Sequence, residues 1–314
     1  MKKRFSMRAL ILLFLPLVVS CAPVTSSQSS SSSASMSSSS VEPTLLDRVD
    51  ATIDAFVEHY GTYYLQPGTY DYQVVAAMKD LDVLSEYSAD TAALSTHILA
   101  SDTSSLTLGQ WYKSIVTLQS LDVDVSTFVD AHLDTLLAGS TSIGQYSSPT
   151  TLWITTLLNN ETYASYQQAA LNDLTQTNTP RLNDIDWGAS IALSLFPHRE
   201  EPAVSTVLEE YFTWLPTVQE EDGAFIESYA WSVANAAIIA NVLLTLVAYD
   251  MDPCAAPFTT GNQSMVEKLL SYSNSDGSFQ YAFGDEDPDL AFTTPLAFTA
   301  LVAYQQFALH GTDQ

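Results

Sequence analysis

Residues 222–225 read Asp-Gly-Ala-Phe, and 54 positions later residues 276–279 read Asp-Gly-Ser-Phe. A second match has nearly the same offset: residues 244–249, Leu-Thr-Leu-Val-Ala-Tyr, return 55 positions later as residues 299–304, Thr-Ala-Leu-Val-Ala-Tyr. Glycine permits a turn with positive φ, and the phenylalanine that follows can pack back into the core. Each copy therefore predicts one structural unit, which consists of an Asp-Gly turn, a polar loop and a long apolar helix ending in tyrosine.

The remainder of the chain after residue 42 has helical patterning. Within residues 45–60 the apolar side chains recur at intervals of three and four, whereas few segments alternate as strands do. The same spacing predicts further helices over residues 71–85, 90–100, 107–120, 125–138, 149–158, 163–175, 184–196, 201–216, 229–249, 263–272 and 290–308. The sequence thus predicts an all-α domain of about twelve helices, or six helical hairpins.

One aromatic side chain stands near the start of a helix in each predicted hairpin. The six are Tyr72, Trp111, Trp153, Trp187, Trp231 and Phe292. If these helices form an inner ring and all begin on one face, their aromatic side chains surround a central mouth. The alternative is that each aromatic side chain only packs its hairpin against the next one. The spacing alone is compatible with both arrangements.

Six helical hairpins with Asp-Gly-x-Phe turns resemble the (α/α)6 toroids of the prenyltransferase and squalene–terpene cyclase repeat superfamily. The resemblance is closer to bacterial surface proteins that carry such repeats. The chain is more distantly similar to the toroid domains of transcobalamin and intrinsic factor. It covers residues 184–307 well and residues 70–160 loosely, and it includes Asp186 and Asn235. It implies an (α/α)6 toroid over residues 42–314 and a cobalamin-type ligand. The candidate ligand-binding residues are therefore Asp186, Asn235 and the six aromatic side chains.

The enzymes of this superfamily have motifs that the chain lacks. Class II terpene cyclases use an Asp-x-Asp-Asp motif, in which neighbouring groups keep one acid neutral. Asp80, Asp122 and Asp184 each begin an Asp-x-Asp pair without the fourth acid, and the five histidines are dispersed. We therefore expect no catalytic residue, metal ligand or cofactor, and a toroid that binds a small ligand or a protein. The alternatives are a diverged cyclase or hydrolase, identified by buried carboxyl groups with raised pKa, and a scaffold without a ligand.

The N-terminal 41 residues have features of a lipoprotein leader and tether. Four cations within the first eight positions precede eleven apolar residues, which are too few for a membrane-spanning helix. Residues 18–21, Val-Val-Ser-Cys, resemble a lipobox, which implies that Cys21 is acylated and becomes the mature N-terminus. Twelve of residues 26–40 are serine, as in a flexible tether. We expect a signal peptide over residues 1–20, a disordered tether over residues 21–41, and a lipid anchor at the extracellular face of a bacterial membrane.

Charge excludes one class of partner. The net charge is −26, and residues 42–314 carry all 36 acidic residues with only six Lys and Arg. Such a surface repels the phosphate backbone, so we expect no nucleic-acid binding. The acidic segment 285–289 is a candidate for Ca²⁺ binding or for a solvated loop. Cys254 is the only cysteine besides Cys21, and we expect a small packed residue there.

Overall fold

The computed structural model describes residues 42–143, 147–176, 184–226, 233–259, 261 and 263–311. Within these residues the fold is all-α, with twelve α-helices, short 3-10 turns and isolated β-bridges in place of strands. The odd-numbered helices are α1 (Leu45–Tyr60), α3 (Ser88–Leu99), α5 (Ala131–Ile143), α7 (Ala164–Leu174), α9 (Pro202–Trp214) and α11 (Met265–Leu270). The even-numbered helices are α2 (Tyr72–Asp80), α4 (Leu108–Ser120), α6 (Ser148–Leu158), α8 (Ile185–Leu195), α10 (Ala236–Ala248) and α12 (Thr293–Gly311). The predicted all-α class and the helix count are confirmed.

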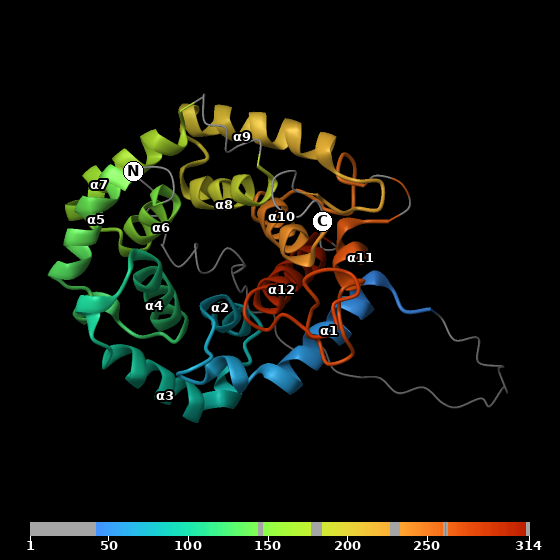
Figure 1. Cartoon of the computed structure of the whole chain (residues 1–314), viewed down its shortest axis with the longest axis horizontal. Helices are drawn as coiled ribbons and strands as arrows, with labels where there is room; N and C mark the ends of the chain where they lie inside the picture. The colour runs from blue at the N-terminus through green and yellow to red at the C-terminus, as the bar shows by residue number, and fades with distance from the viewer. Residues whose placement is uncertain are drawn as a thin grey trace, which may run out of the picture.

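The helices form two layers. Figure 1 shows the even-numbered helices inside and the odd-numbered helices around them. Each inner helix packs against the next, from α2 through α4, α6, α8 and α10 to α12, and α12 packs against α2. The first and last inner helices are therefore neighbours, although more than two hundred residues separate them in the chain.

A ladder of side-chain hydrogen bonds fixes the direction of α10 relative to α8. The Asn241 amide donates to the carbonyl of Asp186 at 3.0 Å. One turn later the Thr245 hydroxyl donates to Ala189 at 3.2 Å, and Tyr249 donates to Ala192 at 2.7 Å. The residue numbers of the donors on the α10 side and of the acceptors on the α8 side increase in the same order, so α8 and α10 run parallel. These bonds also explain how α10 carries polar groups inside an otherwise apolar, buried helix.

The two Asp-Gly turns have the same structure. Gly223 and Gly277 have φ values of 83° and 80°, in the left-handed region that glycine adopts without strain. In each turn the phenylalanine two positions later, Phe225 or Phe279, is fully buried and forms an isolated antiparallel bridge across the turn. The predicted Asp-Gly repeat is therefore a real structural repeat.

Each of these glycines lies against the next outer helix. A Cβ atom on Gly223 would approach the backbone of Ser264, at the start of α11, to 3.0 Å. A Cβ atom on Gly277 would lie 2.3 Å from the backbone nitrogen of Phe56 in α1. The turn before α11 thus docks on α11, and the turn after α11 docks on the first helix of the domain.

Four inner helices end at a left-handed Asp or Asn. The residues with positive φ are Asp82, Asp122, Asn159 and Asp250, after α2, α4, α6 and α10. Short polar side chains tolerate this conformation better than other non-glycine residues. The turn at Asp82 explains why α2 ends at Asp80 and not at residue 85, where the apolar spacing placed its end.

The predicted signal peptide and tether, with Cys21, lie outside the described residues, as does Trp231. Among the helices that the structure does describe, none is both long enough and apolar enough to cross a bilayer.

Candidate functional site

The inner helices surround a central cavity. All six contribute lining residues to this cavity, whose volume is about 380 Å³. That volume falls within the usual range of small-molecule sites, roughly 300–1,000 Å³. The lining includes aromatic rings, aliphatic side chains and two carboxyl groups. The cavity is thus a site built jointly by hairpins that are distant in sequence.

Three aromatic rings from consecutive inner helices form one wall. The rings of Tyr72 and Tyr112 meet edge to face with their centroids 5.4 Å apart, and those of Tyr112 and Trp153 stack at 5.0 Å. Burial raises the pKa of both phenols, so they stay neutral throughout the physiological range. Trp187 and Phe292 add two more rings, and Phe292 is 55% exposed. The rings of Tyr72, Tyr112 and Trp153 are therefore fixed by contact with one another, and the lining reaches solvent at Phe292.

A hydrogen-bonded polar cluster lies on the α8 and α10 side of the cavity. The Asn241 amide donates to Oδ1 of Asp186 at 2.8 Å and also contacts the Ser190 hydroxyl at 3.0 Å. Burial raises the pKa of Asp186, the hydrogen bond from Asn241 opposes the shift, and the charge of Asp184 adds to it. This cluster provides a carboxyl group whose orientation the amide fixes.

Asp80 is a second carboxyl group of the cavity. It is the last residue of α2, so it lies roughly 12 Å along the helix from Tyr72. Its Oδ1 atom is shielded from solvent and has no hydrogen-bond partner among the described residues. Burial raises the pKa of Asp80 to about 7, although the charge of Lys79 opposes the shift. An unpartnered buried carboxyl oxygen is unusual, which makes Asp80 a candidate functional group.

Five of the predicted site residues line this cavity. They are Tyr72, Trp153, Asp186, Trp187 and Phe292. The structure therefore brings together in one cavity residues from α2, α6, α8 and the approach to α12. Trp231 falls outside the described residues.

Two predicted residues have other positions, and both expectations are corrected. Trp111 is fully buried, and its ring lies 4.8 Å from that of Phe128 rather than in the cavity wall. It fits the alternative interpretation, in which the aromatic side chain packs its hairpin against the next one. Asn235 caps α10, where its Oδ1 accepts the Ile238 amide at 3.0 Å. The side chain of Asn235 is thus used to begin the helix.

Among the lining residues that sequence reasoning missed, three carry functional groups used below. Tyr112 follows Trp111 directly, and a rotation of about 100° per residue turns it toward the cavity. Asn241 is one of two polar residues, with Thr245, in the otherwise apolar α10, and that isolation was a signal of its role. Asp80 was read only as the first member of an incomplete motif.

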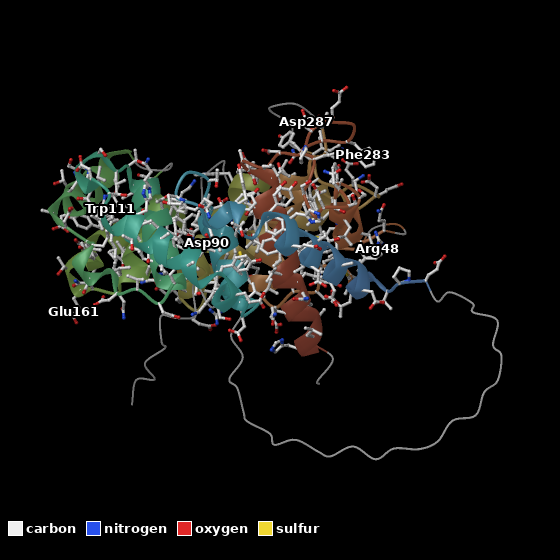
Figure 2. All side chains as sticks on the ribbon, turned by 90° about the horizontal axis from the view of Figure 1, so that it is seen from below. Arg48, Asp90, Trp111, Glu161, Phe283 and Asp287 are labelled. Carbon is white, nitrogen blue, oxygen red and sulfur yellow. The ribbon has the colours of Figure 1, made fainter. Side chains whose placement is uncertain are left out.

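The remaining candidate groups have structural roles. In the acidic loop, where the exposed side chain of Asp287 extends away from the helices (Figure 2), Oδ2 of Asp285 accepts the Ala282 amide, and Asp289 accepts hydrogen bonds from the start of α12. The described residues contain no group of three or more potential metal ligands. The Cys254 thiol is half-buried and lies 3.4 Å from the Tyr304 hydroxyl. Burial raises its pKa, which makes it a weak nucleophile.

Comparison of the chain with family models, with curated proteins and with solved structures gives no significant match. The interpretation of the site therefore rests on its own geometry and chemistry.

Proposed function

We propose that this protein is a lipid-anchored surface lipoprotein whose (α/α)6 toroid binds a small organic ligand in its central cavity without transforming it. The observation that carries the proposal is the cavity itself, because all six inner helices line it and aromatic rings form its wall. A purely structural hub would bring apolar side chains into contact there. The contacts from α2 to α12 and back to α2 support the toroid.

The site contains three kinds of group that a ligand needs. Stacked rings offer flat apolar surface, the Asp186 and Asn241 pair offers directed polar contacts, and Asp80 offers an unsatisfied acceptor. Ligand sites combine a mostly apolar lining with a few placed polar groups in this way. The combination supports binding of a compact organic molecule over binding of a flat protein surface.

Tryptophan fluorescence tests the proposal. The full chain in detergent is titrated with a panel of small neutral, anionic and cationic organic molecules. A ligand in the cavity changes the emission of Trp153 and Trp187, so Trp153→Phe should reduce the response. Trp214→Phe is the matched control, because Trp214 ends the outer helix α9 and does not line the cavity. If no member of the panel changes the emission, the proposal fails.

The lipid anchor has a separate test. The lipobox resemblance predicts that Cys21 carries the acyl chains, which anchor a protein through their buried methylene groups. Replacing Cys21 by Ser should move the chain from the membrane fraction to the medium or the soluble fraction. Cys254→Ser serves as the control and should leave the protein with the membrane. Equal membrane retention of both variants would contradict the anchor.

A cobalamin-type molecule is the most specific ligand that the resemblance suggests for this binding function. A corrinoid is far larger than a cavity of about 380 Å³, so it would lie across the mouth near Phe292 and not inside. Cobalamin binding would be supported if cobalamin quenches the tryptophan fluorescence, and if substitution of Phe292 but not of Asp80 reduces that quenching.

The second candidate function is catalysis by a diverged toroid enzyme. The observation in its favour is that Asp80 and Asp186 line the same cavity and that burial raises the pKa of both. An acid with a pKa near neutrality suits proton transfer. Turnover of a bound molecule, detected by mass spectrometry and abolished in Asp80→Asn, would establish it. Recovery of the bound molecule unchanged would support the binding function.

A further inference from the structure

The central cavity carries negative but no positive groups. Its described lining includes the carboxyl groups of Asp80 and Asp186 and contains no Lys, Arg or His. The two nearest lysines in sequence each contact another side chain. Lys79 pairs with Asp122, and the Lys113 ammonium lies 5.5 Å from the centroid of the Tyr72 ring. The lining itself therefore contributes only negative charge, although Lys113 lies over the ring of one lining residue, Tyr72, and Lys79 is adjacent to Asp80 in sequence.

The aromatic wall attracts the same kind of ligand. The faces of aromatic rings carry negative electrostatic potential and attract ammonium groups within about 6 Å. The contact of Lys113 with Tyr72 shows one such interaction already present at the edge of the wall. The remaining lining side chains are mainly aliphatic or small, including Ala76, Val116 and Leu244. This lining accepts an apolar body next to a charged group.

We propose that the ligand is an organic cation, with an ammonium group that pairs with Asp80 and an apolar body that lies along the aromatic wall. This inference rests on the proposed binding function and names the chemical class of its ligand. Asp80 is assigned the ammonium because its Oδ1 has no partner among the described residues, whereas Asp186 already accepts a hydrogen bond from Asn241. Asp186 contributes the attractive field on the opposite wall of the ring.

The pairing makes affinity depend on pH in one direction. A fixed cation binds the ionised form of Asp80, whose pKa in the empty cavity is about 7. Affinity should therefore fall about tenfold per pH unit below 7 and level off above 8. Lys79 acts on the charge of Asp80, and the other titratable groups that line the cavity are Asp186 and the neutral phenols of the wall. From α12 and α4, the cavity receives no charged side chain.

The test uses quaternary ammonium probes, because their charge does not change with pH. Short alkyltrimethylammonium ions, their neutral tert-butyl isosteres and alkyl carboxylates are titrated into the full-length protein in detergent by calorimetry at pH 6 and pH 8. We expect the ammonium probes to bind at least tenfold more tightly than the neutral isosteres at pH 8, and about tenfold more weakly at pH 6. The carboxylates should be the weakest ligands at both values.

Two variants separate Asp80 from the general acidity of the chain. Asp80→Asn should weaken binding of the ammonium probes at least tenfold at pH 8 and remove most of the pH dependence. Asp82→Asn is the matched control, since Asp82 is exposed, lies outside the cavity lining and has a left-handed backbone that Asn also adopts. It should retain both the affinity and the pH dependence. Circular dichroism checks that both variants are folded.

Each outcome decides the inference. Equal binding of the ammonium ions and their neutral isosteres overturns the cationic class and leaves the proposed binding function intact. Failure of the ammonium ions to bind also overturns the inference, whereas the proposed function is judged by the neutral and anionic members of the fluorescence panel. Loss of affinity in both Asn variants would show that overall charge, and not Asp80, attracts the cation.

Discussion

The hydroxyl of Tyr60 donates a hydrogen bond of 2.6 Å to Oδ2 of Asp276, which lies 216 residues later in the chain. This bond joins the end of α1 to the second Asp-Gly turn. The first Asp-Gly turn makes the corresponding contact with the following outer helix, because Lys268 of α11 lies 2.5 Å from Oδ2 of Asp222. Each Asp-Gly turn thus contacts one outer helix through both its carboxylate and its glycine. The turn at Asp222 contacts α11, and the turn at Asp276 contacts α1, the first helix of the domain.

Tyr60→Phe should lower the free energy of unfolding by about 1 kcal/mol, the usual net value of one hydrogen bond. The measurement is urea denaturation followed by circular dichroism. Tyr63→Phe is the control, because Tyr63 is 40% exposed and its hydroxyl makes no hydrogen bond with the rest of the described chain. If both variants lose the same stability, the contact between α1 and the turn at Asp276 does not contribute as proposed.

Gly277→Ala should destabilise the protein far more than Gly284→Ala. Both glycines have positive φ, at 80° and 92°, so both substitutions incur the left-handed penalty of about 1–2 kcal/mol. Only at Gly277 would the new Cβ atom meet backbone, 2.3 Å from the nitrogen of Phe56, whereas Gly284 has open space around it. We expect a loss of at least about 3 kcal/mol for Gly277→Ala. Equal melting temperatures for the two variants would contradict this packing.

The sequence predicted the helices and the turns better than it predicted the cavity. Apolar spacing and the Asp-Gly repeat depend on local geometry, so they located twelve helices and both turns. Which of two adjacent aromatic residues faces the cavity depends on the rotation of α4 against its neighbours, and this selected Tyr112 over Trp111. The importance of Asp80 depends on burial by segments distant in sequence, which no local pattern reveals.

Asn241→Ala should lower stability by about 2–3 kcal/mol and raise the pKa of Asp186 further. The substitution removes three hydrogen bonds, to the carboxyl and carbonyl groups of Asp186 and to the Ser190 hydroxyl. It also leaves a buried carboxyl group without the amide that stabilises its charged form. A double-mutant cycle with Asp186→Asn measures the pair, and we expect a coupling energy of about 1 kcal/mol or more. Strictly additive effects would mean that the amide does not act through Asp186.

Asp80→Asn should stabilise the empty protein at pH 8 and change its stability little at pH 4. In the unfolded chain the carboxyl group titrates near its ordinary pKa of 3.8, whereas burial holds the folded pKa at about 7. The unfolded state therefore releases the proton first as the pH rises. The contribution of Asp80 to stability is fully present below about pH 4, is lost progressively up to about pH 7, and is constant above it.

A shift of about three pKa units corresponds to a loss of up to about 4 kcal/mol across this range, and an Asn at position 80 avoids that loss. Asp186 has a raised pKa as well, so part of the slope between pH 4 and pH 7 should remain in the variant. The exposed Asp82→Asn control should follow the parent protein within about 0.5 kcal/mol at every pH. Urea titrations from pH 4 to pH 8 give the curves. Parallel curves for Asp80→Asn and the parent protein would show that the Asp80 carboxyl group is ionised in the folded state throughout the range, and that the cavity does not shift its titration.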